Sequence, residues 1–150
     1  MKRLLAILMI LLLMLCAVGC QNSQSAYTKA EIAAKYGVEE SVIDEYHNKY
    51  PKRTDLPNKD GNFAEDYVVV IFYPFANTHT FTPDDFPELQ CTTVRTLIKP
   101  YQDSENPIGM LRIDLENPSK EAVIEAIRLL QLRADIFNAS VDYIFSVNDC

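Results

Sequence analysis

The side chains best suited to acid–base catalysis are two histidines, His47 and His79. Catalysis of that kind needs a histidine, paired carboxylates or an activated cysteine in a pocket. His47 lies in a segment with helical periodicity, and His79 lies between threonines in a predicted loop. Both positions are typical of solvated side chains. Because the sequence also lacks a phosphate-binding glycine loop and a serine elbow, it indicates no enzyme.

Acidic residues gather in two predicted loops, and carboxylate oxygens are the ligands that calcium prefers. They are Asp84, Asp85 and Glu88 in the first loop and Asp103 and Glu105 in the second. Their spacing matches no EF-hand loop. Two of them directly follow a threonine and a proline, as acids do at the start of a helix. We therefore expect surface charge that stabilises a helix dipole, with no metal and no cofactor.

The first twenty residues have the three parts of an export signal. A basic pair, Lys2 and Arg3, is followed by an apolar run over 4–15 and then by small residues up to Cys20. As a helix, the apolar stretch over 4–18 would span about 22 Å, less than the roughly 30 Å hydrocarbon core of a bilayer. The sequence therefore predicts a cleaved secretory signal rather than a permanent membrane span.

The residues Ala17-Val18-Gly19-Cys20 resemble the lipobox of bacterial lipoproteins. In that family the signal is cut before the cysteine, whose thiol then receives diacylglycerol. The resemblance implies that Cys20 is the lipid attachment site and that acyl chains, palmitate among them, anchor the exported chain to the outer face of the bacterial cell membrane. The alternative is an ordinary cleaved signal with an incidental cysteine. Removal of residues 1–19 takes away two basic side chains and changes the net charge from −7 to −9.

Cys91 and Cys150 are candidates for a disulfide, because an exported protein meets oxidising conditions. In the sheet described below, their strands would lie at opposite edges, about 14 Å apart, whereas bridged Cα atoms lie about 6 Å apart. A bridge would therefore require the C-terminal tail to fold across the sheet. The sequence leaves this pairing open.

Residues 28–50 predict two short helices. Thr28 and Glu31 have the spacing of a capping box, Gly37 supplies a stop, and Ser41 is expected to cap the second helix. The segment resembles the helix-turn-helix of DNA-binding proteins. Three lysines stand against five acidic residues in it, a net charge of −2. Because DNA affinity depends on phosphate contacts with basic side chains, DNA binding by residues 28–50 is disfavoured.

Composition divides the chain into five parts. Residues 51–63 hold two prolines, a glycine and alternating charges, which is typical of a linker. The helical pair before it is expected to act as a spacer or to pack on the main domain. The expected parts are a signal peptide over 1–19, a flexible tether over 20–27, a helical hairpin over 28–50, a linker over 51–63 and a folded domain over 64–150.

The folded domain shows strand and helix patterns in an order that defines its class. The run YVVVIFY over 67–73 predicts a central strand covered on both faces. A very short helix after Thr82 is expected next. Further strands are predicted over 92–98, 110–116 and 141–147, and an amphipathic helix from Asn117 to Ala134 precedes the last of them. This order predicts a ferredoxin-like βαββαβ fold of the α+β class, with a four-stranded antiparallel sheet and helices on one face.

Two stretches of this domain resemble known proteins. KEAVIEAIRLLQLRADIFNASVDYIF resembles the last third of subtilisin propeptides and related protease-inhibitor domains, and FTPDDFPEL resembles a segment of secreted Firmicute proteins that carry such domains. The resemblance implies inhibition or chaperoning of a subtilisin-like protease, with the residues after the last strand, 148–150, entering the protease cleft.

A small acidic domain tethered to a membrane, with no catalytic constellation, is predicted to be a protein-binding module. We expect a protein partner to add a strand to an exposed edge of the sheet. An acidic chain is poorly suited to nucleic acid, which is excluded as a partner. Inhibition of a subtilisin-like protease is the more specific alternative.

Overall fold

The computed structural model describes residues 27–76, 79–99 and 109–144. These residues form an α+β fold with a four-stranded antiparallel sheet and three helices. The predicted signal peptide, Cys20 and Cys150 lie outside the described residues. No helix in the described ranges has the length and apolar character needed to cross a bilayer.

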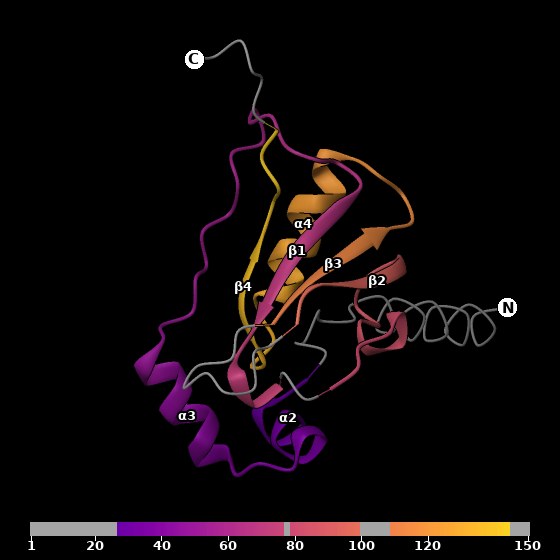
Figure 1. Cartoon of the computed structure of the whole chain (residues 1–150). Helices are drawn as coiled ribbons and strands as arrows, with labels where there is room; N and C mark the ends of the chain where they lie inside the picture. The colour runs from indigo at the N-terminus through magenta and orange to yellow at the C-terminus, as the bar shows by residue number, and fades with distance from the viewer. Residues whose placement is uncertain (1–26, 77–78, 100–108, 145–150) are drawn as a thin grey trace, which may run out of the picture.

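The sheet places the first and third strands in its centre. Its order is β2-β3-β1-β4, and every neighbouring pair is antiparallel (Figure 1). The central position predicted for the first strand is therefore confirmed, and β2 and β4 form the two edges. The strand bounds are Tyr67–Phe72 for β1, Cys91–Ile98 for β2, Met110–Leu115 for β3 and Ile136–Ser140 for β4.

One face of the sheet forms the core, and the other is partly exposed. Along β1, Val68, Val70 and Phe72 are buried, while the alternating residues are only half-buried. The prediction that this strand is covered on both faces was wrong, because the apolar run does not reveal that only one face packs against a helix. That helix is α4, Lys120–Leu130 (Figure 1).

Helix α4 has a side-chain cap at its start. Ser119 is the N-cap, and its side chain accepts a hydrogen bond from the Ala122 N–H at 3.0 Å. Four apolar residues at helical spacing are buried against the sheet: Val123, Ala126, Ile127 and Leu130. The helix was predicted to reach Ala134, but it ends at Leu130, and the chain turns before β4.

The connection between β1 and β2 contains two single 3-10 turns in its described residues, η1 (Pro74–Ala76) and η2 (Pro83–Asp85). The very short helix expected after Thr82 is the second of these turns. Phe86 follows it and is fully buried in the same core as β1 and β3. A large aromatic side chain therefore covers the sheet in this part of the chain.

The last strand was predicted over 141–147, and the structure places it earlier, at Ile136–Ser140. A register shift in its pairing with β1 breaks the alternation of buried and exposed residues, so the sequence pattern missed it. Residues 141–144 instead run beside 62–64, where the Ala64 N–H donates to the Asp142 carbonyl at 3.0 Å. Residues 145–147 lie outside the described ranges.

The helical pair consists of α2 (Lys29–Tyr36) and α3 (Glu40–Lys49). The predicted capping box of Thr28 and Glu31 is confirmed, and so is the stop at Gly37, whose φ of 65° is left-handed. The second helix begins earlier than predicted, with Glu39 rather than Ser41 as its N-cap. Both helices lie at one end of the sheet (Figure 1).

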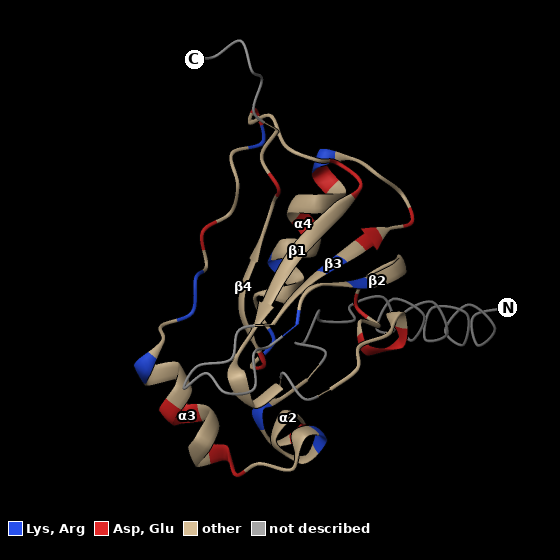
Figure 2. Cartoon of the chain, in the orientation of Figure 1, with Lys and Arg blue, Asp and Glu red and all other residues tan. Residues whose placement is uncertain are grey.

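Residues 51–62, here called the strap, join the helical pair to the sheet without helix or strand. Acidic and basic positions alternate along the strap (Figure 2). It runs beside β4 and the turn before it, since the Arg53 N–H donates to the Phe137 carbonyl at 3.3 Å and the Gln131 amide donates to the Asp55 carbonyl at 3.1 Å. Phe63, the next residue, is buried in the core.

Candidate functional site

A fully buried arginine lies at the end of the sheet nearest the helical pair. Arg133 and Asp135 are both 0% exposed and form a two-pronged ion pair, with Nε–Oδ1 at 3.0 Å and Nη2–Oδ2 at 2.9 Å. Nη1 of the arginine donates to Glu88 Oε1 at 3.0 Å and to the Asp85 carbonyl at 2.6 Å. Such a buried charge is tolerated only where its donors are satisfied, and this one is well supplied.

Aromatic rings and charge keep this guanidinium protonated. Its carbon lies 4.8 Å from the ring centre of Tyr27 and 5.0 Å from that of Phe86. Burial alone would lower the pKa of Arg133, but the hydrogen bonds and negative charges of Asp135 and Glu88 raise it above its ordinary value. The arrangement therefore fixes a cation in place.

The helical pair closes over this ion cluster. The Tyr36 hydroxyl of α2 donates to Asp135 Oδ2 at 2.8 Å, and Lys35 Nζ lies 2.7 Å from Asp85 Oδ1. Burial, followed by the charge of Asp135, raises the pKa of Tyr36. From the strap, Lys52 donates to the carbonyl of Arg133, and burial lowers the pKa of this lysine to about 8. Segments far apart in the sequence thus meet at one charged centre.

Asp85 links η2 to both the helical pair and the loop before it. Its Oδ1 receives Lys35 and lies 3.0 Å from His79 Nε2, and its Oδ2 accepts the Thr82 N–H at 2.8 Å. Burial would raise the pKa of Asp85, but the hydrogen bonds from Lys35, Thr82 and His79 bring it down to about 2. Asp85 therefore stays ionised, and its role in the structure is to hold these groups together.

The two histidines predicted to be solvated differ in the structure. His79 is exposed, as expected. His47 is half-buried, its Nε2 lies 2.8 Å from the Ala134 carbonyl, and its ring centre lies 4.8 Å from that of Tyr73. The prediction for His47 was wrong because α3 packs on the start of β4. A ring nitrogen beside a carbonyl carries the proton, so His47 docks the helix.

The acidic residues considered as calcium ligands do not form a metal site in the described part of the chain. Asp84 is exposed, whereas Asp85 and Glu88 are bound by basic side chains. Across the described ranges no three His, Cys, Asp or Glu side chains come together in a way that could hold an ion. Asp103 and Glu105 lie outside those ranges.

Of the three cysteines predicted to be modified or paired, the structure describes one. Cys91 is half-buried at the start of β2, and its Sγ lies 3.8 Å from the Pro83 carbonyl. Burial, and then the charge of Glu88, raises the pKa of this thiol. The opposite edges predicted for β2 and the last strand are confirmed. With Cys150 outside the described residues, the disulfide stays a prediction, as does the lipid at Cys20.

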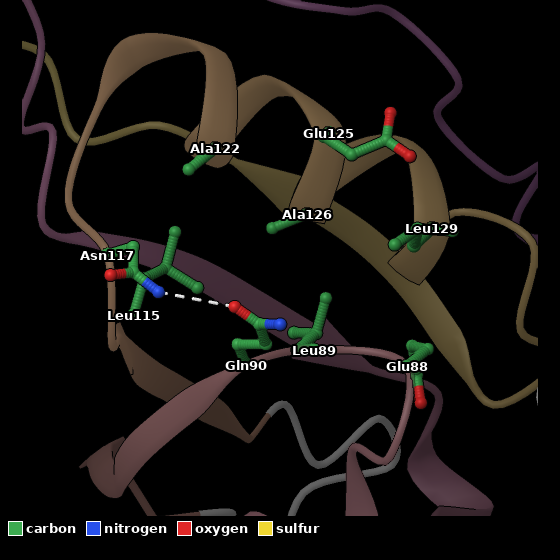
Figure 3. Close-up of a pocket in the computed structure, with 9 residues that line it drawn as sticks. All are labelled: Glu88, Leu89, Gln90, Leu115, Asn117, Ala122, Glu125, Ala126 and Leu129. Carbon is green, nitrogen blue, oxygen red and sulfur yellow. Dashed lines mark hydrogen bonds between the residues drawn. The ribbon is translucent and has the colours of Figure 1, made fainter.

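A shallow groove of about 250 Å³ lies between α4 and the segment that leads into β2 (Figure 3). In Figure 3, Ala122, Ala126 and Leu129 of the helix lie on one side and Leu89 and Gln90 on the other. Asn117 donates to the Gln90 side-chain oxygen at 3.2 Å across one end. The small side chains of Ala122 and Ala126 line this groove.

The two edges of the sheet differ in their exposure. Edge strand β4 has the strap beside it. Edge strand β2 has no strand beyond it in the described residues, and its last four residues, 95–98, are exposed. Leu97 and Ile98 are each 50% exposed. An edge strand with unpaired backbone groups and exposed apolar side chains is a template for another strand.

Sequence reasoning named Asp85 and Glu88 but missed Arg133 and Asp135, although one signal for this pair was present. Arg133 and Asp135 stand on either side of Ala134 within a stretch that is otherwise mostly apolar. Charged residues in such a stretch are rarely buried unless they pair with each other. Comparisons of the chain with family models, with curated proteins and with solved structures find no match.

Proposed function

We propose that this chain is an extracytoplasmic lipoprotein, anchored through Cys20, whose sheet binds a protein partner by strand addition at β2. The observation that supports the partner site is the contrast between the sheet edges, since the strap lies beside β4 while residues 95–98 of β2 are exposed. The anchor rests on the sequence of residues 17–20. Hydrogen bonds along the backbone of β2 would give affinity, and Leu97 and Ile98 would give apolar contact.

The sheet order supports a ferredoxin-like arrangement. Strands β1 and β3 lie inside, and α4 connects β3 to β4, which are separated by β1. The departure from the full βαββαβ order lies between β1 and β2, where two 3-10 turns stand in the described residues. We propose that the chain is a reduced member of this architecture, with part of its helical layer replaced by aromatic side chains such as Phe86.

The anchor is tested by labelling source cells with radioactive palmitate. Wild type should incorporate the label, and Cys20→Ala should lose it and remain as the unprocessed chain. Label that persists in Cys20→Ala, or an unlabelled wild type, would remove the lipoprotein assignment. Cys91→Ala is the matched control, since it changes a thiol at a position that the proposal does not lipidate.

Strand addition is tested with proline, which removes a backbone donor. N–H groups alternate in direction along an edge strand, so one of Arg95 and Thr96 directs its N–H away from β3. The variant Arg95→Pro or Thr96→Pro that preserves the native circular dichroism spectrum is the outward one. This outward-facing proline variant should no longer crosslink to the protein partner that the wild-type chain crosslinks to in intact cells. Full crosslinking by a folded outward-facing variant would exclude β2.

A second candidate is inhibition of a subtilisin-like protease, and one observation favours it. Because β4 ends at Ser140, a longer stretch follows the last strand than residues 148–150 alone. Soluble residues 21–150 should slow a subtilisin-type protease, and deletion of 145–150 should abolish the effect. Unchanged cleavage in the presence of the intact chain would eliminate this candidate.

A further inference from the structure

The helical pair is held against the sheet by polar contacts from both of its helices and from the chain that follows. Tyr36 donates to Asp135, His47 meets the Ala134 carbonyl, and the Tyr73 hydroxyl donates to the Tyr50 carbonyl at 2.9 Å. These contacts converge on residues 133–135 and on the end of β1. They fix the helical pair at one place on the domain.

Apolar packing reinforces this attachment. Ile32 and Ile43, which are fully buried, form a second small core inside the helical pair. Tyr36 and Phe75 pack against both this core and the main core of the sheet, so the two cores are continuous. Tyr27, the first described residue, packs on the same small core. Separating the pair from the sheet would expose these side chains and uncover the buried charges of the ion cluster.

We propose that only residues 21–26 serve as the spacer between lipid and protein, and that the helical pair forms the end of the molecule nearest the membrane. The inference rests on the proposed lipid at Cys20. From Cys20 to Tyr27 there are seven residue steps, which cover at most about 24 Å when fully extended. An undocked helical pair, with both helices intact, would have lengthened the reach from Cys20 to Phe63 to at most roughly 110 Å.

This short spacer limits how far the folded protein can lie from the membrane. A domain of this length measures roughly 35 Å across, so every part of it stays within about 60 Å of the lipid headgroups. The turn at 58–61 lies at the end of the molecule opposite α2 (Figure 1) and is the part farthest from the membrane. A partner that binds β2 must therefore meet it close to the membrane surface, which fits a protein held in the same membrane.

Energy transfer to labelled lipid measures how far each part of the protein lies from the membrane. The lipidated full chain, with Cys91→Ala and Cys150→Ser, carries a dye at Ala34→Cys in α2 or at Lys59→Cys in the opposite turn, both exposed positions. It is bound to phosphatidylcholine–phosphatidylglycerol vesicles with an acceptor on the headgroups. We expect roughly two-fold or greater transfer from position 34 than from position 59. Inserting 40 Gly/Ser residues after Ala26 should remove most of the transfer from position 34, because such a chain adds about 35 Å on average.

The outcomes distinguish the proposal of a short spacer from the proposal of a lipid anchor. The short spacer would be overturned, and the lipid anchor kept, by either of two results in firmly bound protein. One is equal transfer from positions 34 and 59, and the other is transfer that the insertion leaves unchanged. If the purified wild-type chain does not bind vesicles at all, both the lipid anchor and the short spacer are overturned. The Cys20→Ala chain sets the background for binding.

Discussion

Two arginines of the sheet domain form ion clusters with opposite surroundings. Arg133 is fully buried, and its partners are the Asp85 carbonyl in η2, Glu88 in the segment that follows, and Asp135 just before β4. The Arg112 side chain, on the open face of β3, remains 26% exposed. It lies 3.6 Å above the Tyr67 ring and pairs with Asp66 at 3.1 Å. Burial is the difference, and it decides which cluster the fold depends on.

The contrast teaches that ion pairs should be weighed by what their removal exposes. Losing Arg133 would leave Asp135 and Glu88 buried without a cation. Losing Arg112 would leave Asp66, which water reaches easily, and Asp114, which is mostly covered. The Arg133 cluster therefore joins segments that are distant in the sequence, whereas the Arg112 cluster is a contact on a partly exposed surface.

The largest effect is expected from Arg133→Met. It should lower the free energy of unfolding by about 3–5 kcal/mol, because it leaves two buried carboxylates without their partner. Urea denaturation of soluble residues 21–150 measures this. The matched variant Arg112→Met should cost only about 0.5–1 kcal/mol. Equal losses in the two variants would show that burial is not the deciding factor.

Tyr36→Phe comes next, since it removes a hydrogen bond to the charged Asp135 without creating a large cavity. We expect a loss of about 1.5–3 kcal/mol in the free energy of unfolding. Tyr67→Phe, which removes a hydroxyl that donates to the exposed Asp142, is the control and should cost less. If the two tyrosines prove equivalent, the docking of α2 contributes little to stability.

A pH dependence should come from Asp85, whose pKa of about 2 lies below its value in an unfolded chain, about 3.9. Below the unfolded value the unfolded state binds more protons than the folded state. Stability from this group is therefore present above pH 4 and lost as the pH falls toward 2. The stability difference between wild type and Asp85→Asn, measured by urea denaturation, should shrink across that window. A difference that stays constant from pH 5 to pH 2 would contradict the ionised Asp85.

The smallest effect is expected on the exposed surface of α4. Arg128 and Glu125 pair at 2.6 Å across one helical turn, and both side chains are largely exposed. Arg128→Gln should change the free energy of unfolding by no more than about 0.5 kcal/mol. A loss near that of Arg133→Met would mean that the exposed pair, too, holds the fold.

Elements with local signals could be predicted from the sequence. The capping box at Thr28, the stop at Gly37 and the central strand β1 each depend on residues close together in the chain, and the structure has all three. The position of β4 could not be predicted, because a register shift against β1 decides it. A shift of this kind depends on strands distant in the sequence, which a pattern of alternation does not contain.

The meeting of these charges in one cluster could not be predicted, for a related reason. Glu88, Arg133 and Asp135 look like surface charges until the fold brings them together, and nothing in the chain before Tyr36 indicates that α2 covers them. The packing of the helical pair was accordingly left open between spacer and docked element. The structure places it against the sheet.

Hydrogen exchange tests most directly whether the helical pair and the sheet behave as one unit. In soluble residues 21–150, the amides of Ile32 and Ile43 should open with the same free energy as those of Val68 and Val70 in β1, because docking joins the two cores. The shared value should fall in Arg133→Met. Rapid exchange at Ile32 and Ile43 while β1 stays protected would show that the pair detaches from the sheet, and the account would fail.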